Sequence, residues 1–449
     1  MHDLNLPITL VADQTWNLST VPQQRIRVLG NLGGTSTRTL TVTGNGCLSI
    51  YSTNDFAGNV ELAGGVMKVF SKQRPFGSGA EGGEIIIDQS KGATLEMWGA
   101  VIDKPIRLTS SSSATSGAFS ARPGYGDSAI TAPIYQTGSD RFAVYQEPGT
   151  TLTLSGGGTF TGPVMFYPES TAVRKLVIEG NPIIQQKLRD RSKAFNFHGK
   201  TELHLKSQGN RMYIELGGAQ SGTGSSLHCW TNDVLNHQCD IILGYGSTLD
   251  LHGFDQQVGD LLAGSAGRIR SDEPVSLLAY YEDGITWGVN SGIDGAVSFR
   301  KSGPKQLTMN GTSTSTGTLI AFAGPLVIGE TGVWQGTNVC VGFENSNRHP
   351  SLRLTHNNCF ANGRKTILTM TTTDGSIGFS TDAGAARTPE LILDEGVKVL
   401  VREAIVDGQH LASGTWGGAE SPAAHKDNTY FSGKGVLNVI GQGLIITIL

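Results

Sequence analysis

The densest group of potential metal ligands lies in the segment SSLHCWTNDVLNHQCD, which contains His228, Cys229, His237 and Cys239 within about a dozen residues. Structural zinc binds four such imidazole and thiolate donors. The spacing matches no standard zinc finger, and in a strand His228 and Cys229 would point to opposite faces. The segment therefore predicts either a zinc site built from a loop or buried thiols beside loop histidines. No other cofactor is predicted.

A pair of carboxylates is the second candidate for chemistry. Hydrolysis of a glycosidic bond needs two carboxyl groups at a defined separation across that bond. Asp250 and Asp255 flank the DLHGFD step and are the candidate catalytic pair. The alternative is that they belong to solvated strand edges, where acidic residues oppose aggregation. The chain has no Gly-x-Ser-x-Gly, His-Glu-x-x-His or Asp-Thr/Ser-Gly motif.

A basic segment, NPIIQQKLRDRSKAF from Asn181 to Phe195, predicts a short helix with Asn181 as N-cap and a proline at the first helical position. Its cations Lys187, Arg189 and Arg191 are candidate ligands for sulfated or sialylated glycans, since clustered cations attract anionic polymers. The alternative is a solvated helical face.

An aromatic segment near the end of the chain, SGTWGGAESPAAHKDNTYFSGKGVLNV, contains Trp416 and Tyr430. One interpretation makes these rings a platform for sugars. The other makes the segment a cap that covers the apolar column and terminates the strand ladder of a repeat protein.

The elements that must position these residues are short strands. TTLTLSGGGTFTGPV, residues 150–164, predicts strand, glycine turn and strand, because apolar residues alternate on either side of the glycines. Similar units of about 20 residues recur along the chain, which is typical of a repeat architecture. We expect an all-β chain folded as a parallel β-helix, or β-solenoid, with tandem β-sandwich modules as the alternative. The predicted regions are 1–180 (repeats), 181–244 (an atypical insert with the helix) and 245–449 (repeats ending in a cap).

Composition supports this fold class and limits the function. Glycine makes up 61 of 449 residues, about twice the usual share of roughly 7%. The net charge of −4 and the lack of a basic stripe argue against nucleic-acid binding. No apolar run approaches the ~18 residues of a membrane-spanning helix, so no membrane span is expected.

Three segments carry a resemblance to a known family. They are RKSGPKQLTMNGTSTSTGTLIAFAGPLVIG, STLDLHGFDQQVGDLLAGSAGRIRS and DGQHLASGTWGGAESPAAHKDNTYFSGKGVLNV. They resemble the autotransporter-associated β-strand repeat, its linking segment and a closing cassette, as found in proteins of mucus-dwelling Gram-negative bacteria. The first segment matches most of the family pattern but lacks the aromatic residue of its aromatic-Thr-Gly step. The resemblance implies a secreted protein or one on the outer surface of a Gram-negative bacterium.

Two functions follow from these observations. The first is an exported or surface-associated repeat protein that binds an extracellular glycoprotein or glycan such as mucin, in adhesion. The alternative is a secreted hydrolase that degrades mucin-like glycoprotein or polysaccharide. The lack of a recognisable catalytic motif favours binding.

Overall fold

The computed structural model is nearly all β: of the residues that it describes, 52% lie in strands and 1% in helix. The described residues are 2–18, 25–70, 74–77, 82–110, 119–137, 142–168, 173–180, 184–186, 194–197, 200–217, 224–244, 246–342, 349–372 and 388–441. They form two compact units, Met1–Cys239 (unit 1) and Asp240–Leu449 (unit 2).

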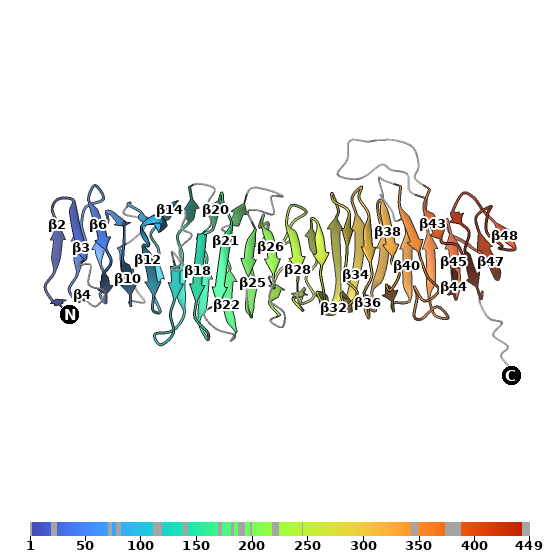
Figure 1. Ribbon diagram of the computed structural model, residues 1–449, viewed down its shortest axis with the longest axis horizontal. Helices are drawn as coiled ribbons and strands as arrows, with labels where there is room; N and C mark the ends of the chain where they lie inside the picture. Colours follow the sequence, from blue (N-terminus) through green and yellow to red (C-terminus); the bar gives the residue numbers. More distant parts are fainter. Residues whose placement is uncertain are drawn as a thin grey trace. The chain divides into compact units, whose positions relative to one another are not determined.

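Unit 1 consists of three long parallel ladders and one short one (Figure 1). Sheet A contains β1 (His2–Leu4), β4 (Arg25–Val28), β7 (Cys47–Ile50), β10 (Val66–Val69), β12 (Thr94–Met97), β15 (Phe119–Ala121), β18 (Phe142–Gln146), β21 (Val164–Pro168), β24 (Phe195–Phe197) and β26 (Tyr213–Leu216). Sheet B contains β3 (Gln14–Leu18), β6 (Thr39–Gly44), β9 (Asn59–Leu62), β11 (Ile85–Asp88), β14 (Ile106–Ser110), β17 (Ile134–Gln136), β20 (Gly158–Phe160) and β23 (Ile184–Gln186). Sheet C contains β13 (Val101–Ile102), β16 (Ser128–Ile130), β19 (Thr151–Leu154), β22 (Arg174–Ile178), β25 (Thr201–Leu205) and β27 (Ser226–Cys229). The short ladder is β2 (Ile8–Leu10), β5 (Leu32–Gly34) and β8 (Asp55–Phe56), and η2 (Gln89–Lys91) is a 3-10 turn.

Unit 2 is also built mainly from parallel ladders. Sheet D contains β29 (Thr248–Asp250), β32 (Arg268–Tyr280), β34 (Gly292–Ser302), β37 (Thr318–Ala321), β40 (Asn338–Val341), β42 (Ile367–Met370), β45 (Glu403–Val406) and β46 (Gln409–His410), with β30 (Gln256–Val258) on β32. Sheet E contains β33 (Ile285–Thr286), β35 (Leu307–Met309), β38 (Pro325–Ile328), β41 (Ser351–Leu354), β43 (Glu390–Leu393) and β49 (Phe431–Gly433). Two pairs are β28 (Asp240–Leu243) with β31 (Leu261–Ala263), and β36 (Thr312–Ser313) with β39 (Val333–Trp334). Sheet F contains β44 (Lys398–Val401), β50 (Val436–Val439), β47 (Gly414–Gly417) and β48 (His425–Lys426).

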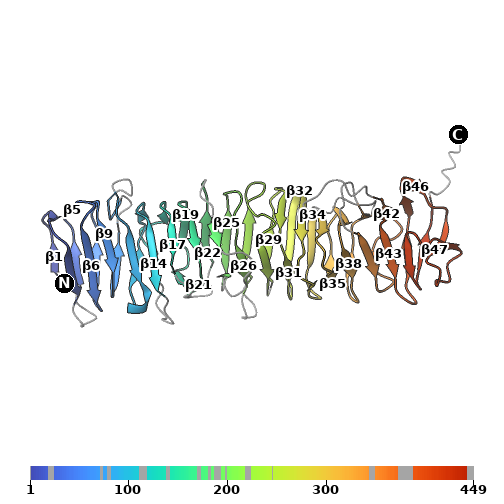
Figure 2. The ribbon, with the colours of Figure 1, turned by 90° about the horizontal axis from the view of Figure 1, so that it is seen from above.

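The pairing confirms the β-solenoid and excludes β-sandwich modules. Outside the region β45–β50, strands that are neighbours in a ladder are not neighbours in sequence and they pair in parallel, whereas a β-sandwich is built from antiparallel strands. In Figure 2 the sheet B strands β6, β9, β14 and β17 follow one another along unit 1. The repeat length is less regular than the expected 20 residues. In sheet A the paired residue lies between 19 positions (Leu48 to Met67) and 31 positions (Val164 to Phe195) further along.

The interior is built from stacked rows of apolar side chains. One row of sheet A runs through five in-register positions, at most 1% exposed: Val28, Ile50, Val69, Met97 and Ala121. Because side chains alternate across a strand, the residue after each of these positions points outward. Burial of one such aliphatic side chain stabilises the fold by about 1.5–3 kcal/mol.

Two lysines are completely buried and hold turns in place. Lys104 Nζ donates to the carbonyl oxygens of Phe56 and Gly58, at 2.8 and 2.7 Å. In unit 2, Lys301 Nζ donates to two backbone carbonyl oxygens at 2.9 and 2.7 Å. A buried ammonium is tolerated only when it is hydrogen-bonded, so each lysine ties the backbone of neighbouring turns together.

The helix expected over Asn181–Phe195 is wrong where it can be checked. Ile184–Gln186 form strand β23, which pairs with β20, and Phe195 begins β24. Pairing with β20 at the end of the sheet B ladder outweighs the local helix signals, because the backbone of β23 gains hydrogen-bond partners there.

Lys187, Arg189 and Arg191 lie outside the described residues, as does the apolar end of the chain after Gln442. Among the described residues, no helix is long and apolar enough to cross a membrane.

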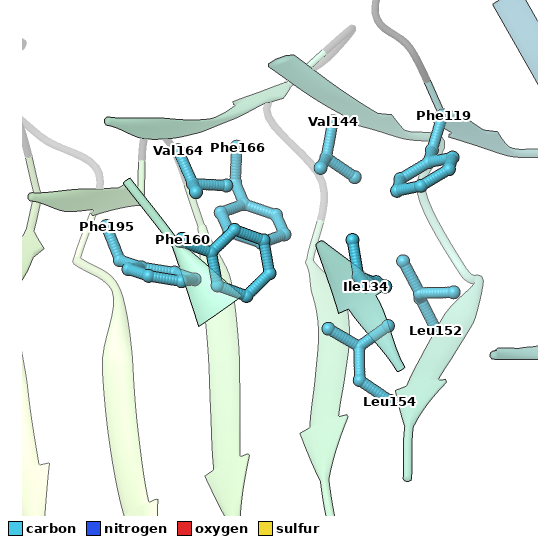
Figure 3. Close-up of a pocket in the computed structure, with 9 residues that line it drawn as sticks. All are labelled: Phe119, Ile134, Val144, Leu152, Leu154, Phe160, Val164, Phe166 and Phe195. Carbon is cyan, nitrogen blue, oxygen red and sulfur yellow. The ribbon is translucent and has the colours of Figure 1, made fainter. Parts of the chain in front are cut away.

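A small cavity lies in the core of unit 1 (Figure 3). It is lined only by apolar side chains from all three sheets: Phe119, Ile134, Val144, Leu152, Leu154, Phe160, Val164, Phe166 and Phe195. Its volume of about 10 Å³ is on the scale of one water-sized sphere. It is therefore a packing gap in the core and not a binding site.

Phe166→Ala is expected to destabilise unit 1 strongly. Phe166 is 5% exposed and stacks on Phe197, with ring centroids 4.7 Å apart, so its removal should cost about 3–5 kcal/mol. Thermal unfolding followed by circular dichroism measures the effect. Tyr135→Ala, at an exposed position of the same unit, is the control and should change little. Equal melting temperatures for Phe166→Ala and the wild type would contradict the assigned core.

Candidate binding face

The outward side of sheet A in unit 1 carries a row of aromatic rings. Ile50, Val69 and Met97 are in-register partners in β7, β10 and β12, and all three point inward. The residue that directly follows each of these strands is aromatic (Tyr51, Phe70 and Trp98) and points outward. β10 and β12 are labelled in the blue part of Figure 1.

Tyr125 joins this row from the turn after β15, and a glycine lets it approach. Gly99 has φ +65°, and a Cβ there would lie 2.2 Å from the carbonyl oxygen of Tyr125. Only a residue without a side chain lets the turn pass so close to Trp98. We call Tyr51, Phe70, Trp98 and Tyr125 the aromatic strip.

Rings of the strip contact one another along the stack. Tyr51 and Phe70 are stacked with centroids 4.3 Å apart, and Phe70 and Trp98 are 5.3 Å apart. Tyr125 meets Phe70 edge-on at 5.2 Å and Trp98 edge-on at 6.0 Å. Tyr51 is 37% exposed and Tyr125 50% exposed. The stacked faces are covered by their neighbours, so the strip presents ring edges, tyrosine hydroxyls and the outer surface of Tyr125 to a ligand.

Beside the strip lies a group of four paired charges, which we call the charge cluster: Lys68, Glu96, Arg122 and Glu147. Glu96 is only 7% exposed and accepts from Lys68 Nζ at 2.8 Å and from Arg122 at 3.2 Å. Arg122 also pairs with Glu147. Trp98 Nε1 donates to Glu96 at 3.3 Å, and the Lys68 ammonium lies 5.5 Å from the Trp98 ring centroid. The cluster thus fixes the indole, and its formal charges cancel.

A second aromatic group projects from sheet C. His204 of β25 and His228 of β27 are in-register partners, stacked at 4.5 Å. Trp230, 40% exposed, donates from Nε1 to Nδ1 of His204 at 2.8 Å. Nδ1 therefore carries no proton, and the His204 proton sits on Nε2, 3.3 Å from Glu202. The contacts require a neutral imidazole, and burial lowers the pKa of His204, against the opposing effect of Glu202.

The four predicted zinc ligands do not converge. In β27 the Cys229 side chain is buried in the interior, whereas His228 points outward, so the two cannot bind one ion. Cys239 Sγ is also buried and donates to the carbonyl oxygen of Asn210 at 2.7 Å, whereas His237 is exposed. Strand alternation separates donors that lie close together in sequence.

Both predicted catalytic carboxylates have structural partners. Asp250 is buried and accepts from Arg270 Nε at 2.7 Å, so it forms an ion pair across β29 and β32. Asp255 is exposed and accepts from the backbone N–H of Ser276 at 2.7 Å. These contacts give both carboxylates a structural role in the fold. Their catalytic role stays a prediction.

Trp416 and Tyr430 lie near one another in sequence but make different contacts. Trp416 stacks on His425 at 4.6 Å, and its indole donates to the carbonyl oxygen of Ala412. Tyr430 donates to Asp407 at 2.6 Å. In this region β46 and β47 pair antiparallel with β45 and β50, unlike the parallel ladders before them. This packing agrees with the cap interpretation, and the role in sugar binding stays a prediction.

The aromatic strip was not predicted from the sequence. Its signal is an apolar residue followed by an aromatic one at the end of a short strand: Ile50-Tyr51, Val69-Phe70 and Met97-Trp98. Each pair alone is unremarkable in a β-protein. Only the register, with partners 19 and 28 positions apart, brings the rings together.

Comparison of the chain with protein-family models, curated proteins and solved structures gives no significant match. The resemblance to the autotransporter-associated repeat therefore stays a prediction.

The Trp230–His204 contact predicts a loss of stability in mild acid. The folded-state pKa of His204 is lowered, while the unfolded value stays near about 6.5. The stabilisation is complete above about pH 6.5 and declines as the pH falls through the folded pKa, because the unfolded chain takes up the proton first. Titration of the imidazole by NMR should give a pKa below that of a model histidine, and Trp230→Phe should raise it. A wild-type pKa at or above that of an ordinary exposed histidine would contradict the assigned tautomer.

Proposed function

We propose that the protein binds an extracellular glycan or glycoprotein along the outward side of sheet A in unit 1. The observation that carries the proposal is the aromatic strip: four rings on consecutive turns of a rigid scaffold, partly exposed and held by the charge cluster. An extracellular location, and mucin as an example of the ligand, come from the resemblance of the repeats alone.

The geometry of the strip suits an extended polymer. Successive turns of parallel strands lie about 4.8 Å apart, so Tyr51, Phe70 and Trp98 follow one another along the stack, and Tyr125 packs edge-on against Phe70 and Trp98. Aromatic side chains supply large apolar area, and tyrosine hydroxyls add hydrogen bonds. The rings are already fixed by stacking, so little side-chain freedom is lost on binding. Tyr125 and Tyr51, which are 50% and 37% exposed, contribute the most accessible rings, and the charge cluster holds the Trp98 indole between them.

The hydrolase alternative rests on Asp250 and Asp255, and their contacts are those of structural residues. The proposal is therefore one of binding.

Tyr125→Ala and Trp98→Ala are expected to weaken binding to mucin or to its released glycans by at least about tenfold, which corresponds to 1.4 kcal/mol. Surface plasmon resonance on immobilised mucin measures the change. Tyr125 is the sharper test, because its exposed side chain contributes little to folding. The matched control is Tyr135→Ala, an exposed tyrosine on sheet B outside the strip.

Melting temperatures establish that each variant is folded. Unchanged binding by Tyr125→Ala, or an equal loss in Tyr135→Ala, would contradict the proposed face.

A further inference from the structure

The charges around the aromatic strip suggest which glycans it selects. Resting on the proposed function, we infer that the strip takes an uncharged glycan chain and disfavours sulfated or sialylated ones. The inference concerns the row next to the strip, which passes through five in-register residues: Arg27, Ser49, Lys68, Glu96 and Ser120. Ser49, Glu96 and Ser120 are buried, so the partly exposed members of this row are the cations Arg27 and Lys68.

Each cation in this row is already paired with a carboxylate. Arg27 forms a bidentate ion pair with Asp3, in which Nε donates to Oδ1 at 2.7 Å. Lys68 pairs with Glu96 at 2.8 Å. An anionic sugar would have to compete with these carboxylates for the same ammonium and guanidinium groups.

Arg122, on the strip's own row, lies between two carboxylates. It contacts Glu96 on one side and Glu147 on the other. Glu96 cannot move aside readily, because it is nearly buried and also accepts from Lys68 and from the Trp98 indole. A sulfate near Arg122 would therefore meet two fixed negative charges, and bringing like charges together is unfavourable.

A neutral pyranose has no such conflict. Its hydroxyls can hydrogen-bond the tyrosine hydroxyls and the outer oxygens of Glu147, while its C–H groups contact the ring edges. The rings of Tyr51, Phe70 and Trp98 follow one another at 4.3 and 5.3 Å, and Tyr125 packs edge-on against both Phe70 (5.2 Å) and Trp98 (6.0 Å). The occupant that fits this compact group of rings and paired charges is an uncharged oligosaccharide.

The test uses an array of oligosaccharides in matched neutral, sulfated and sialylated forms, probed with the full chain. The wild type should bind neutral members at least about tenfold more tightly than their anionic counterparts. Its affinity should change little between low and physiological salt, since no net charge is neutralised.

Glu147→Gln sharpens the test, because it removes one carboxylate and leaves Arg122 with an excess positive charge. This variant should bind sulfated members several-fold more tightly than the wild type at low salt, and the gain should vanish at high salt. The matched control is Glu179→Gln, which breaks a similar ion pair with Lys206 on sheet C. It should leave the preference unchanged.

Three results would overturn the inference. A wild-type preference for sulfated or sialylated members, with steep salt dependence, would contradict the selectivity and leave the binding face intact. Equal gains in Glu147→Gln and Glu179→Gln would mean that the charge cluster does not set selectivity. No binding to any array member, or binding to mucin that survives removal of its glycans, would reject both the inference and the proposed function.

Discussion

Parallel strand pairing between successive turns is the constraint on which the structure depends. Each turn supplies the hydrogen-bond partners of the turn before it, so residues at equivalent positions must lie above one another. An inward position is then apolar on turn after turn, as in the row from Val28 to Ala121. Irregular loop lengths are tolerated because they leave this register intact, and partners lie between 19 and 31 positions apart in sheet A.

The same constraint organises the outer surface. A residue that follows an inward position must point outward beside its equivalents on neighbouring turns. Aromatic residues at three such positions therefore stack, although Tyr51 and Trp98 are separated by 46 residues of sequence. Charges stack by the same rule, which brings Lys68, Glu96 and Arg122 into contact. An ordered row of aromatic and charged side chains therefore arises in this fold without any local motif.

This explains what the sequence could and could not predict. The unit Thr150–Val164 was predicted as strand, turn and strand, and it forms β19 and β20 and begins β21, with Leu152 and Leu154 both buried. The alternation of apolar and polar residues and the glycine turn are local signals, and the folded structure keeps both. The helix over Asn181–Phe195 failed at Ile184–Gln186, because a ladder partner outweighs capping preferences. The four predicted zinc ligands are not brought together, because strand alternation separates His228 from Cys229. The aromatic strip was missed because no local feature reveals the register.

The most direct test of in-register stacking is a distance measured across several turns of unit 1. Thr15 and Thr159 are exposed and lie on one outward row of sheet B, linked through Thr41, Glu61, Ile86, Arg107 and Tyr135. Spin labels on Thr15→Cys and Thr159→Cys, read by pulsed electron resonance, should give a narrow distribution near about 29 Å, from six steps of about 4.8 Å. A broad distribution, or one centred far from this value, would contradict in-register stacking and the binding face built on it.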